Sequence, residues 1–159
     1  MINQSRIVLL MCVLPATIAL ASCKTVPLKP SSESKAKVAL SAAADVNPDA
    51  AGKPSPVIVR VYQLKGDTAF SGADFFALFD DDMKVLGPEL IGREEYVLTP
   101  SESRTVELAV QKTAKFIGVM AAFRDIRNSQ WRVVVPAPLK KNNVTLSVER
   151  ARVQLAPGK

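Results

Sequence analysis

Short stretches of alternating apolar and polar residues, separated by turn formers, run through the chain from residue 36 onward. Residues 57–64 (VIVRVYQL) are rich in β-branched side chains and place three valines on one face, which predicts a strand. Residues 115–123 are apolar on both faces, as is typical of a strand in the middle of a covered sheet. The same alternation predicts shorter strands at residues 37–41, 95–98, 104–110, 131–135, 144–148 and 151–155, with a bulge or break near residues 149–150.

Residues 71–81 (SGADFFALFDD) follow a different period. Their large apolar residues are spaced at i, i+3 and i+4, and Ser71 followed by Asp74 has the pattern of a helix N-cap. We therefore expect one short helix inserted among about seven or eight short strands. This set of elements favours an all-β fold with a short helical insertion, built as a two-sheet β-sandwich.

The apolar residues of the predicted helix allow two interpretations. They can pack the helix onto the sandwich, where each large side chain contributes about 1.5–3 kcal/mol on burial. Alternatively, they can form an exposed patch that docks a partner. We favour packing, because so short a helix needs most of its apolar residues for its own stability. The residues concerned are Phe75, Phe76, Leu78 and Phe79.

Residues 1–22 have the pattern of an export signal peptide. Arg6 supplies the positive charge, residues 7–20 form the apolar region, and two small residues end the segment. A membrane-spanning helix is the rival interpretation, but a span needs about 20 apolar residues. This run is shorter and contains Pro15, which favours the signal peptide.

The chain has two cysteines, Cys12 and Cys23. Cys12 lies in the apolar region and would be discarded with the signal, so Cys23 has no partner for a disulfide in the mature chain. The residues after Cys23 offer neither a histidine nor a helix N-terminus to activate a thiol. Leu20-Ala21-Ser22-Cys23 resembles the bacterial lipobox, an aliphatic residue and two small residues before a cysteine. The resemblance implies cleavage before Cys23, thioether lipidation of its sulfur and acylation of its new amino group.

Residues 24–35 (KTVPLKPSSESK) are rich in Pro, Ser and Lys and have no apolar period, which is typical of a flexible tether. Such a tether reaches up to about 40 Å at roughly 3.3 Å per residue. The predicted organisation is a signal peptide at residues 1–22, lipidated Cys23 and tether at 23–35, and a β-sandwich domain at 36–159. Lys24 stands where an Asp tends to retain enteric lipoproteins in the inner membrane, which indicates the outer membrane.

Charge and composition exclude several functions. Lys and Arg number 21 against 15 Asp and Glu, a formal charge of +6 that favours a solvated basic surface over a nucleic-acid patch. No stretch combines clustered Lys and Arg with aromatic residues. The chain has no histidine, which excludes Ser-His and Cys-His catalysis and histidine metal sites.

The carboxylates do not form a recognisable catalytic or metal site either. Asp80-Asp81-Asp82 lacks the alternating acids, glycine and later glutamate of a calcium loop, which favours a solvated helix end. Glu94 and Glu95 are adjacent on a predicted strand and point to opposite faces. Asp125, flanked by Arg124 and Arg127, favours a local ion pair. We therefore expect no enzyme activity, no metal, and no cofactor other than the covalent lipid on Cys23.

Residues 47–56 (NPDAAGKPSP) form a connection dense in turn formers. As a hairpin connection it is longer than the usual two to five residues, about twice the upper end. It can be a tolerated surface loop or a binding loop on a rigid scaffold. Proline pre-sets φ and so lowers the entropy lost on binding, which suits recognition. The residues alone leave both interpretations open.

Together with Cys23, three segments resemble the type VI secretion outer-membrane lipoprotein family (TssJ, also called VasD). They are NPDAAGKPSPVIVRVYQLKGDTAF from residue 47, ADFFALFDDDMKVLG from residue 73 and GVMAAFRDIRNSQWR from residue 118. The resemblance extends over roughly residues 38–155. It implies a transthyretin-like β-sandwich with a helical addition. Transthyretin-like hydrolases need histidines, so the likeness is one of scaffold and not of chemistry.

The resemblance also implies a role in assembly. Members are lipoproteins of the outer membrane that face the periplasm and bind the periplasmic C-terminal region of the large inner-membrane subunit TssM. With a further inner-membrane protein, TssL, that subunit builds a trans-envelope complex. The family's partner contact involves the loop between the first two strands, which maps onto residues 47–56. The predicted partner-binding residues are Asn47, Pro48, Gly52, Lys53, Pro54 and Ser55.

The expected partners are therefore the periplasmic domain of TssM and outer-membrane lipid, with neither nucleic acid nor a small-molecule substrate. An alternative is a lipoprotein that binds a small molecule or glycan on its sandwich. That function needs exposed aromatic residues near polar groups, and most aromatic residues here fall in strand or helix patterns that predict burial. An exported enzyme would have to rely on carboxylates alone, and no residue supports it.

Overall fold

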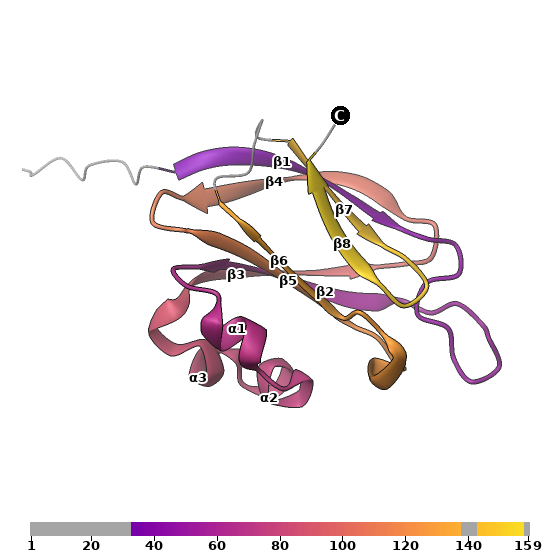
Figure 1. The fold of residues 1–159 in the computed structure, drawn as a ribbon. Helices are drawn as coiled ribbons and strands as arrows, with labels where there is room; N and C mark the ends of the chain where they lie inside the picture. The colour runs from indigo at the N-terminus through magenta and orange to yellow at the C-terminus, as the bar shows by residue number, and fades with distance from the viewer. Residues whose placement is uncertain (1–32, 138–142, 158–159) are drawn as a thin grey trace, which may run out of the picture. The chain divides into compact units, whose positions relative to one another are not determined.

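The computed structural model describes residues 33–137 and 143–157, which form a β-sandwich (Figure 1). Eight strands are present in this part of the chain, and short helices lie between β2 and β3 and between β5 and β6. The predicted residue span of each strand is recovered to within a few residues, except that β3 is longer than expected. The strands are β1 Glu33–Ala42, β2 Val57–Leu64, β3 Leu90–Leu98, β4 Ser103–Gln111, β5 Phe116–Ala122, β6 Arg132–Pro136, β7 Asn143–Val148 and β8 Val153–Pro157.

Two four-stranded sheets form the sandwich, in the orders β4-β1-β7-β8 and β3-β2-β5-β6. Neighbouring strands run antiparallel, except that β1 and β7 run parallel. The predicted two-sheet, transthyretin-like architecture is confirmed. The phase break expected near residues 149–150 is the turn between β7 and β8.

The first strand starts earlier than the sequence indicates. β1 begins at Glu33, inside the stretch 23–35 that we predicted as tether, because its first residues pair with the far end of β4 (Glu33 opposite Gln111). The boundary between tether and domain therefore moves from residue 36 to residue 33. The predicted signal peptide, Cys23 and the rest of the tether lie outside the described residues.

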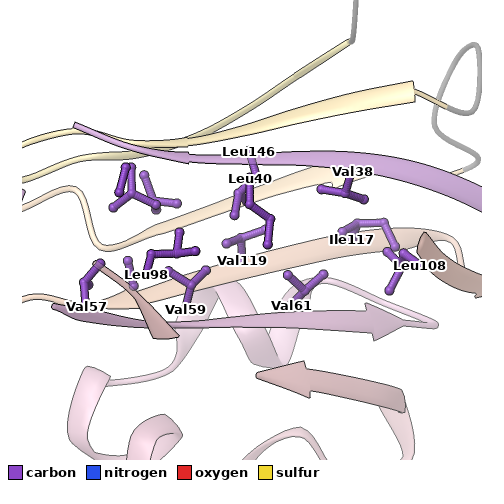
Figure 2. Packing of buried hydrophobic residues seen from close by; sticks show 14 of the residues in the cluster. Val38, Leu40, Val57, Val59, Val61, Leu98, Leu108, Ile117, Val119 and Leu146 are labelled. Carbon is purple, nitrogen blue, oxygen red and sulfur yellow. The ribbon is translucent and has the colours of Figure 1, made fainter. Parts of the chain in front are cut away.

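The core lies between the two sheets (Figure 2). Val57, Val59 and Val61 line the inner face of β2, as their alternation predicts, and all three are buried. Leu40 from β1 and Leu146 from β7 face them from the other sheet and are fully buried. Each such side chain contributes about 1.5–3 kcal/mol by leaving water, so the alternating pattern itself supplies the force that closes the sandwich.

Strand β5 is covered on both faces, which explains why it is apolar throughout. Ile117 and Val119 point into the sandwich core, while Met120 packs under the helical insertion. A Cβ atom at Gly118 would lie only 3.0 Å from the ring of Phe70, so glycine lets the insertion approach the sheet closely.

The helical insertion is not the single helix that residues 71–81 predict. It is divided because two aspartates each begin a new helix. The Asp74 carboxylate accepts hydrogen bonds from the amides of Phe76 (2.9 Å) and Ala77 (3.3 Å), so Asp74 is the N-cap and Ser71 lies in the preceding helix. Asp81 caps the next helix through the amide of Lys84 at 3.2 Å. The elements are α1 Thr68–Gly72, α2 Phe75–Asp80, α3 Asp82–Leu86 and the 3-10 helix η1 Gly87–Glu89.

The packing interpretation of α2 holds for three of its four large apolar residues. Phe75 and Leu78 are buried against the outer face of the β2–β5 sheet, and Phe79 is half-buried beside them. Phe76 is different, because 62% of its surface is exposed. The insertion thus covers the outer face of one sheet (Figure 1) and leaves one aromatic ring in solvent.

Asp82 corrects the prediction of a solvated acidic run, because only 3% of its surface is exposed. Its Oδ2 accepts hydrogen bonds from Arg93 Nη1 (2.6 Å), Arg60 Nη1 (3.4 Å) and the Tyr62 hydroxyl (3.1 Å). Burial, together with the nearby Asp82 carboxylate, raises the pKa of Tyr62, so its hydroxyl remains a donor. Arg60 also donates to the Phe79 carbonyl at 2.7 Å, which ties the insertion to β2.

Candidate functional site

Residues 43–56 connect β1 to β2, the first two strands, as the sequence predicts. The connection is not a hairpin, however, because β1 and β2 belong to different sheets. The chain must cross one end of the sandwich between them (Figure 1), and this crossing explains a length above that of ordinary hairpin loops.

Asn47 anchors the start of this loop inside the protein. Its side-chain Nδ2 donates to the Pro56 carbonyl (2.7 Å), and its Oδ1 accepts from the Arg124 amide (2.8 Å). Its own amide donates to the Arg150 carbonyl at 3.0 Å. Asn47 adopts φ = +48°, a left-handed conformation that asparagine tolerates better than most residues. It therefore joins the loop to the β5–β6 connection and the β7–β8 turn.

The tip of the loop is closed by its own hydrogen bonds. Asp49 Oδ1 accepts from the amides of Ala51 and Lys53, both at 2.9 Å. The Asp49 amide donates to the Lys53 carbonyl, and the Gly52 amide donates to the Asp49 carbonyl, again both at 2.9 Å. Gly52 has φ = +79°, which glycine adopts without strain. The tip is thus shaped before any partner arrives, which lowers the entropy cost of binding.

The structure separates the six predicted partner-binding residues into three groups. Gly52 and Lys53 are exposed at the tip, together with Ala50 and Ala51. Pro48 and Pro54 are half-buried along its sides, and Asn47 and Ser55 are buried at its base. Only the first two groups present surface to a partner, whereas Asn47 and Ser55 hold the loop in place.

Sequence reasoning missed Asp49 as the residue that organises the tip. An aspartate followed three residues later by a glycine is a turn pattern that could have indicated it. It also missed that the β5–β6 connection borders the loop, because this arrangement depends on a contact between segments that are distant in the sequence. The local ion pair predicted at Asp125 is absent, because its carboxylate accepts from Asn128 Nδ2 at 2.9 and 3.1 Å instead.

A hollow of about 540 Å³ lies beside the loop. Its walls come from three separate segments of the chain, residues 47–50, 123–125 and 150–151. Arg150 pairs with Asp45 at 3.6 Å on its rim. The lining combines small residues with Phe123 and the cations Arg124 and Arg150. Residues 33–137 and 143–157 hold no cluster of three or more histidine, cysteine, aspartate or glutamate side chains that could bind a metal.

Replacing Asn47 by alanine is expected to destabilise the protein by about 2 kcal/mol, because the Arg124 amide and the Pro56 carbonyl lose their partner and alanine must adopt a positive φ. Asn47→Gly relieves the backbone and should recover part of the loss. Urea denaturation measures both. Equal stability of Asn47→Ala and the unsubstituted protein would show that the loop is not anchored through this side chain.

A comparison with known protein families identifies the family of this chain. The family profile described as "Type VI secretion lipoprotein, VasD, EvfM, TssJ" matches residues 34–155. The chain belongs to this family. The family resemblance noted from the sequence is therefore confirmed, and this type VI secretion lipoprotein is an assembly component and not an enzyme. A sequence comparison with curated proteins finds no significant match.

Solved structures agree with the assignment. This type VI secretion lipoprotein is 32% identical to the lipoprotein TssJ1 from Pseudomonas aeruginosa, with a TM-score of 0.73, over 80% of its own length and 98% of that chain. It is 25% identical to Serratia marcescens Lip, a membrane-bound component of the type VI secretion system, with a TM-score of 0.72, covering 80% and 99% of the two chains. A chain in the structure described as the TssM C-terminal domain (869–1107) from EAEC is 31% identical, with a TM-score of 0.65 and coverage of 78% and 98%.

The part of the lipoprotein that the structure describes contains no helix long and apolar enough to cross a membrane.

Proposed function

We propose that this lipoprotein binds the periplasmic C-terminal region of TssM through the exposed tip of the β1–β2 loop. Acyl chains on Cys23 hold it on the periplasmic face of the outer membrane, so that it tethers the trans-envelope complex. The observation that carries the proposal is the tip itself, in which four hydrogen bonds hold exposed residues in one shape. Loops presented on a rigid scaffold are a common form of binding site.

The direction of β1 supports this arrangement. The segment that follows Cys23 enters the domain at Glu33, and the ten residues of β1 lead to the opposite end of the sandwich, where the loop begins (Figure 1). Ten strand residues extend roughly 30 Å at about 3.3 Å each. The point at which the chain enters the domain and the start of the loop therefore lie at opposite ends of β1.

The identity of the partner is supported by similarity. A chain in the structure described as the TssM C-terminal domain shares 31% identity with this lipoprotein over 98% of that chain. Serratia marcescens Lip, a membrane-bound component of the type VI secretion system, shares its fold. These relatives favour TssM as the partner and the membrane as the place of action.

The test measures the affinity of the full-length lipoprotein, purified in detergent, for the periplasmic region of TssM from the same genome. A tip variant, Ala51→Glu with Lys53→Glu, changes exposed residues and keeps Asp49 and Gly52, which shape the tip. We expect micromolar or tighter binding and at least a tenfold loss in the variant, about 1.4 kcal/mol. The loss follows because two carboxylates replace a methyl group and a cation at the contact.

The matched control introduces the same charges at the other end of the sandwich. Lys112→Glu with Thr113→Glu changes two exposed residues in the β4–β5 turn, next to Gln111, which pairs with Glu33. This control should bind as the unsubstituted protein does. Absence of binding by the intact lipoprotein would refute the proposal. If the tip variant and the control variant both bind with the affinity of the unsubstituted protein, the tip is not the site.

A further inference from the structure

A second hollow, of about 360 Å³, lies between α2 and the β5–β6 connection. We call it the Phe76 groove, and its lining residues are Phe76, Arg124, Asp125, Ile126 and Arg127. Arg124 and Asp125 also line the hollow beside the β1–β2 loop. The two hollows therefore share a wall, and the Phe76 groove adjoins the surface around the β1–β2 loop.

Phe76 is a rigid aromatic residue held in solvent. Its ring meets Phe75 edge-on at 5.2 Å between centroids, and Phe75 meets Trp131 edge-on at 5.2 Å. Phe75 is buried in the insertion core, so the exposed ring of Phe76 packs against a side chain that is itself held in place. A protein gains nothing for its own stability by exposing 62% of a phenylalanine, and such a ring provides binding energy when a partner covers it.

The groove is cationic. Arg124 and Arg127 are exposed, and within the described residues neither side chain forms a hydrogen bond or ion pair. The one anion of the groove, Asp125, has both carboxylate oxygens engaged by the Asn128 amide group. Two free guanidinium groups beside an exposed ring are complementary to a segment that carries carboxylates next to an apolar side chain.

We infer that the Phe76 groove is the second half of the partner-binding surface and receives an acidic segment of the same partner. An apolar side chain of that segment packs on Phe76, and its Asp or Glu side chains pair with Arg124 and Arg127. The inference rests on the proposed function. Because the two hollows share lining residues, a partner bound at the loop also reaches the Phe76 groove. Burying the ring supplies affinity, and the charge pairs supply orientation and a faster encounter.

The test compares two groove variants with two matched controls in the full-length lipoprotein. Phe76→Ser removes the exposed ring, and Arg124→Glu with Arg127→Glu reverses the groove charge while leaving the Arg124 amide bonded to Asn47. The controls lie on α3: Met83→Ser removes an apolar side chain that is 72% exposed, and Lys84→Glu reverses an exposed cation. Each groove variant should weaken binding to the periplasmic region of TssM about tenfold, which is about 1.4 kcal/mol. The controls should match the unsubstituted protein.

The salt dependence of the affinity for TssM separates the contribution of the charge pairs to binding from that of the apolar contact. Affinity of the unsubstituted protein and of Phe76→Ser should fall as NaCl is raised, because salt screens exposed ion pairs. The double arginine variant should be markedly less salt-sensitive. Unchanged melting temperatures of the variants would show that they are folded, and a variant that unfolds is replaced by Phe76→Ala or Arg127→Gln.

The outcomes distinguish this inference from the proposed function. If the loop-tip variant loses binding and both groove variants keep it, the groove inference is wrong and the proposed function stands. If the intact lipoprotein does not bind TssM, both fail. A third measurement uses Cys23→Ser protein, which lacks the acyl chains, with and without the two arginine substitutions, and records its binding to vesicles of anionic phospholipid. If the arginine variant loses vesicle binding but keeps TssM binding, the groove recognises lipid and the inference is overturned.

Discussion

Replacing Asp82 by alanine is expected to lower the free energy of unfolding by about 3 kcal/mol, the lower end of the cost of breaking a buried ion pair. The lower end applies because Arg93 is 44% exposed in its side chain and can turn to water when its partner is removed. Arg60 cannot do so as easily, since its side chain is only 12% exposed and is fixed by the Phe79 carbonyl and by Glu95. The Tyr62 hydroxyl would lose its acceptor as well.

The three consecutive aspartates provide a graded set of controls. Asp80 is exposed, and within the described residues its side chain forms no hydrogen bond or ion pair, so Asp80→Ala should change stability by less than about 0.5 kcal/mol. Asp81 caps α3, and Asp81→Ala should cost about 1 kcal/mol. Only Asp82→Ala should reach about 3 kcal/mol. The three residues are of the same type and adjacent in the sequence. A stability loss that increases in this order would therefore be due to their different environments in the fold.

Urea denaturation followed by the fluorescence of Trp131, the only tryptophan, measures this series. Trp131 contacts Phe75 of α2, so it reports on the insertion directly. The midpoint should move while the slope stays the same. Equal midpoints for Asp80→Ala and Asp82→Ala would show that the buried network does not stabilise the fold. Because the insertion carries Phe76, a loosened insertion should also weaken any binding through the Phe76 groove.

Replacing Cys23 by serine is expected to remove nearly all of the lipoprotein from the outer-membrane fraction. Without the sulfur there is no thioether lipid and no lipoprotein-type cleavage that would free an amino group for acylation. A single acyl chain gives only marginal membrane binding, about 10⁴ M⁻¹, and stable anchoring takes two or more signals. The variant should therefore be found in the soluble or inner-membrane fraction.

Cys12 provides the matched control, because it is the only other cysteine in the chain and lies in the segment predicted to be discarded. Cys12→Ser should fractionate with the outer membrane and incorporate a labelled fatty acid as the unsubstituted protein does. Sucrose-gradient separation of the membranes and fatty-acid labelling make the two measurements. Retention of Cys23→Ser in the outer membrane, or loss of label from Cys12→Ser, would refute Cys23 as the lipid attachment.

Much of the sandwich could be predicted because its signals are local. A strand with one buried face alternates with period two, as in β2, and a strand covered twice is apolar throughout, as in β5. Helix caps are local as well, since Asp74 bonds amides two and three residues ahead. Choosing Asp74 rather than Ser71 as the cap required the structure, because both have side chains suited to that position.

The loop was located from the sequence, but the roles of its residues were not. Asn47 looked like a turn residue that a partner could contact. Its Oδ1 is bound by the amide of Arg124, which is 77 residues away in the chain. No local pattern indicates such a contact. The shared wall at Arg124 that joins the loop to the Phe76 groove could not be predicted for the same reason.

The chain's own pattern determined the strands, the sandwich and the place of the loop, because period-two burial and turn chemistry act between near neighbours. Only the tertiary structure decided which polar residues are buried. Asp82 and its two aspartate neighbours are chemically the same, yet Asp82 alone meets Arg60, Tyr62 and Arg93, which lie 22, 20 and 11 residues away. A carboxylate is buried where the folded chain brings cations and donors to it, since its desolvation must be offset by those partners.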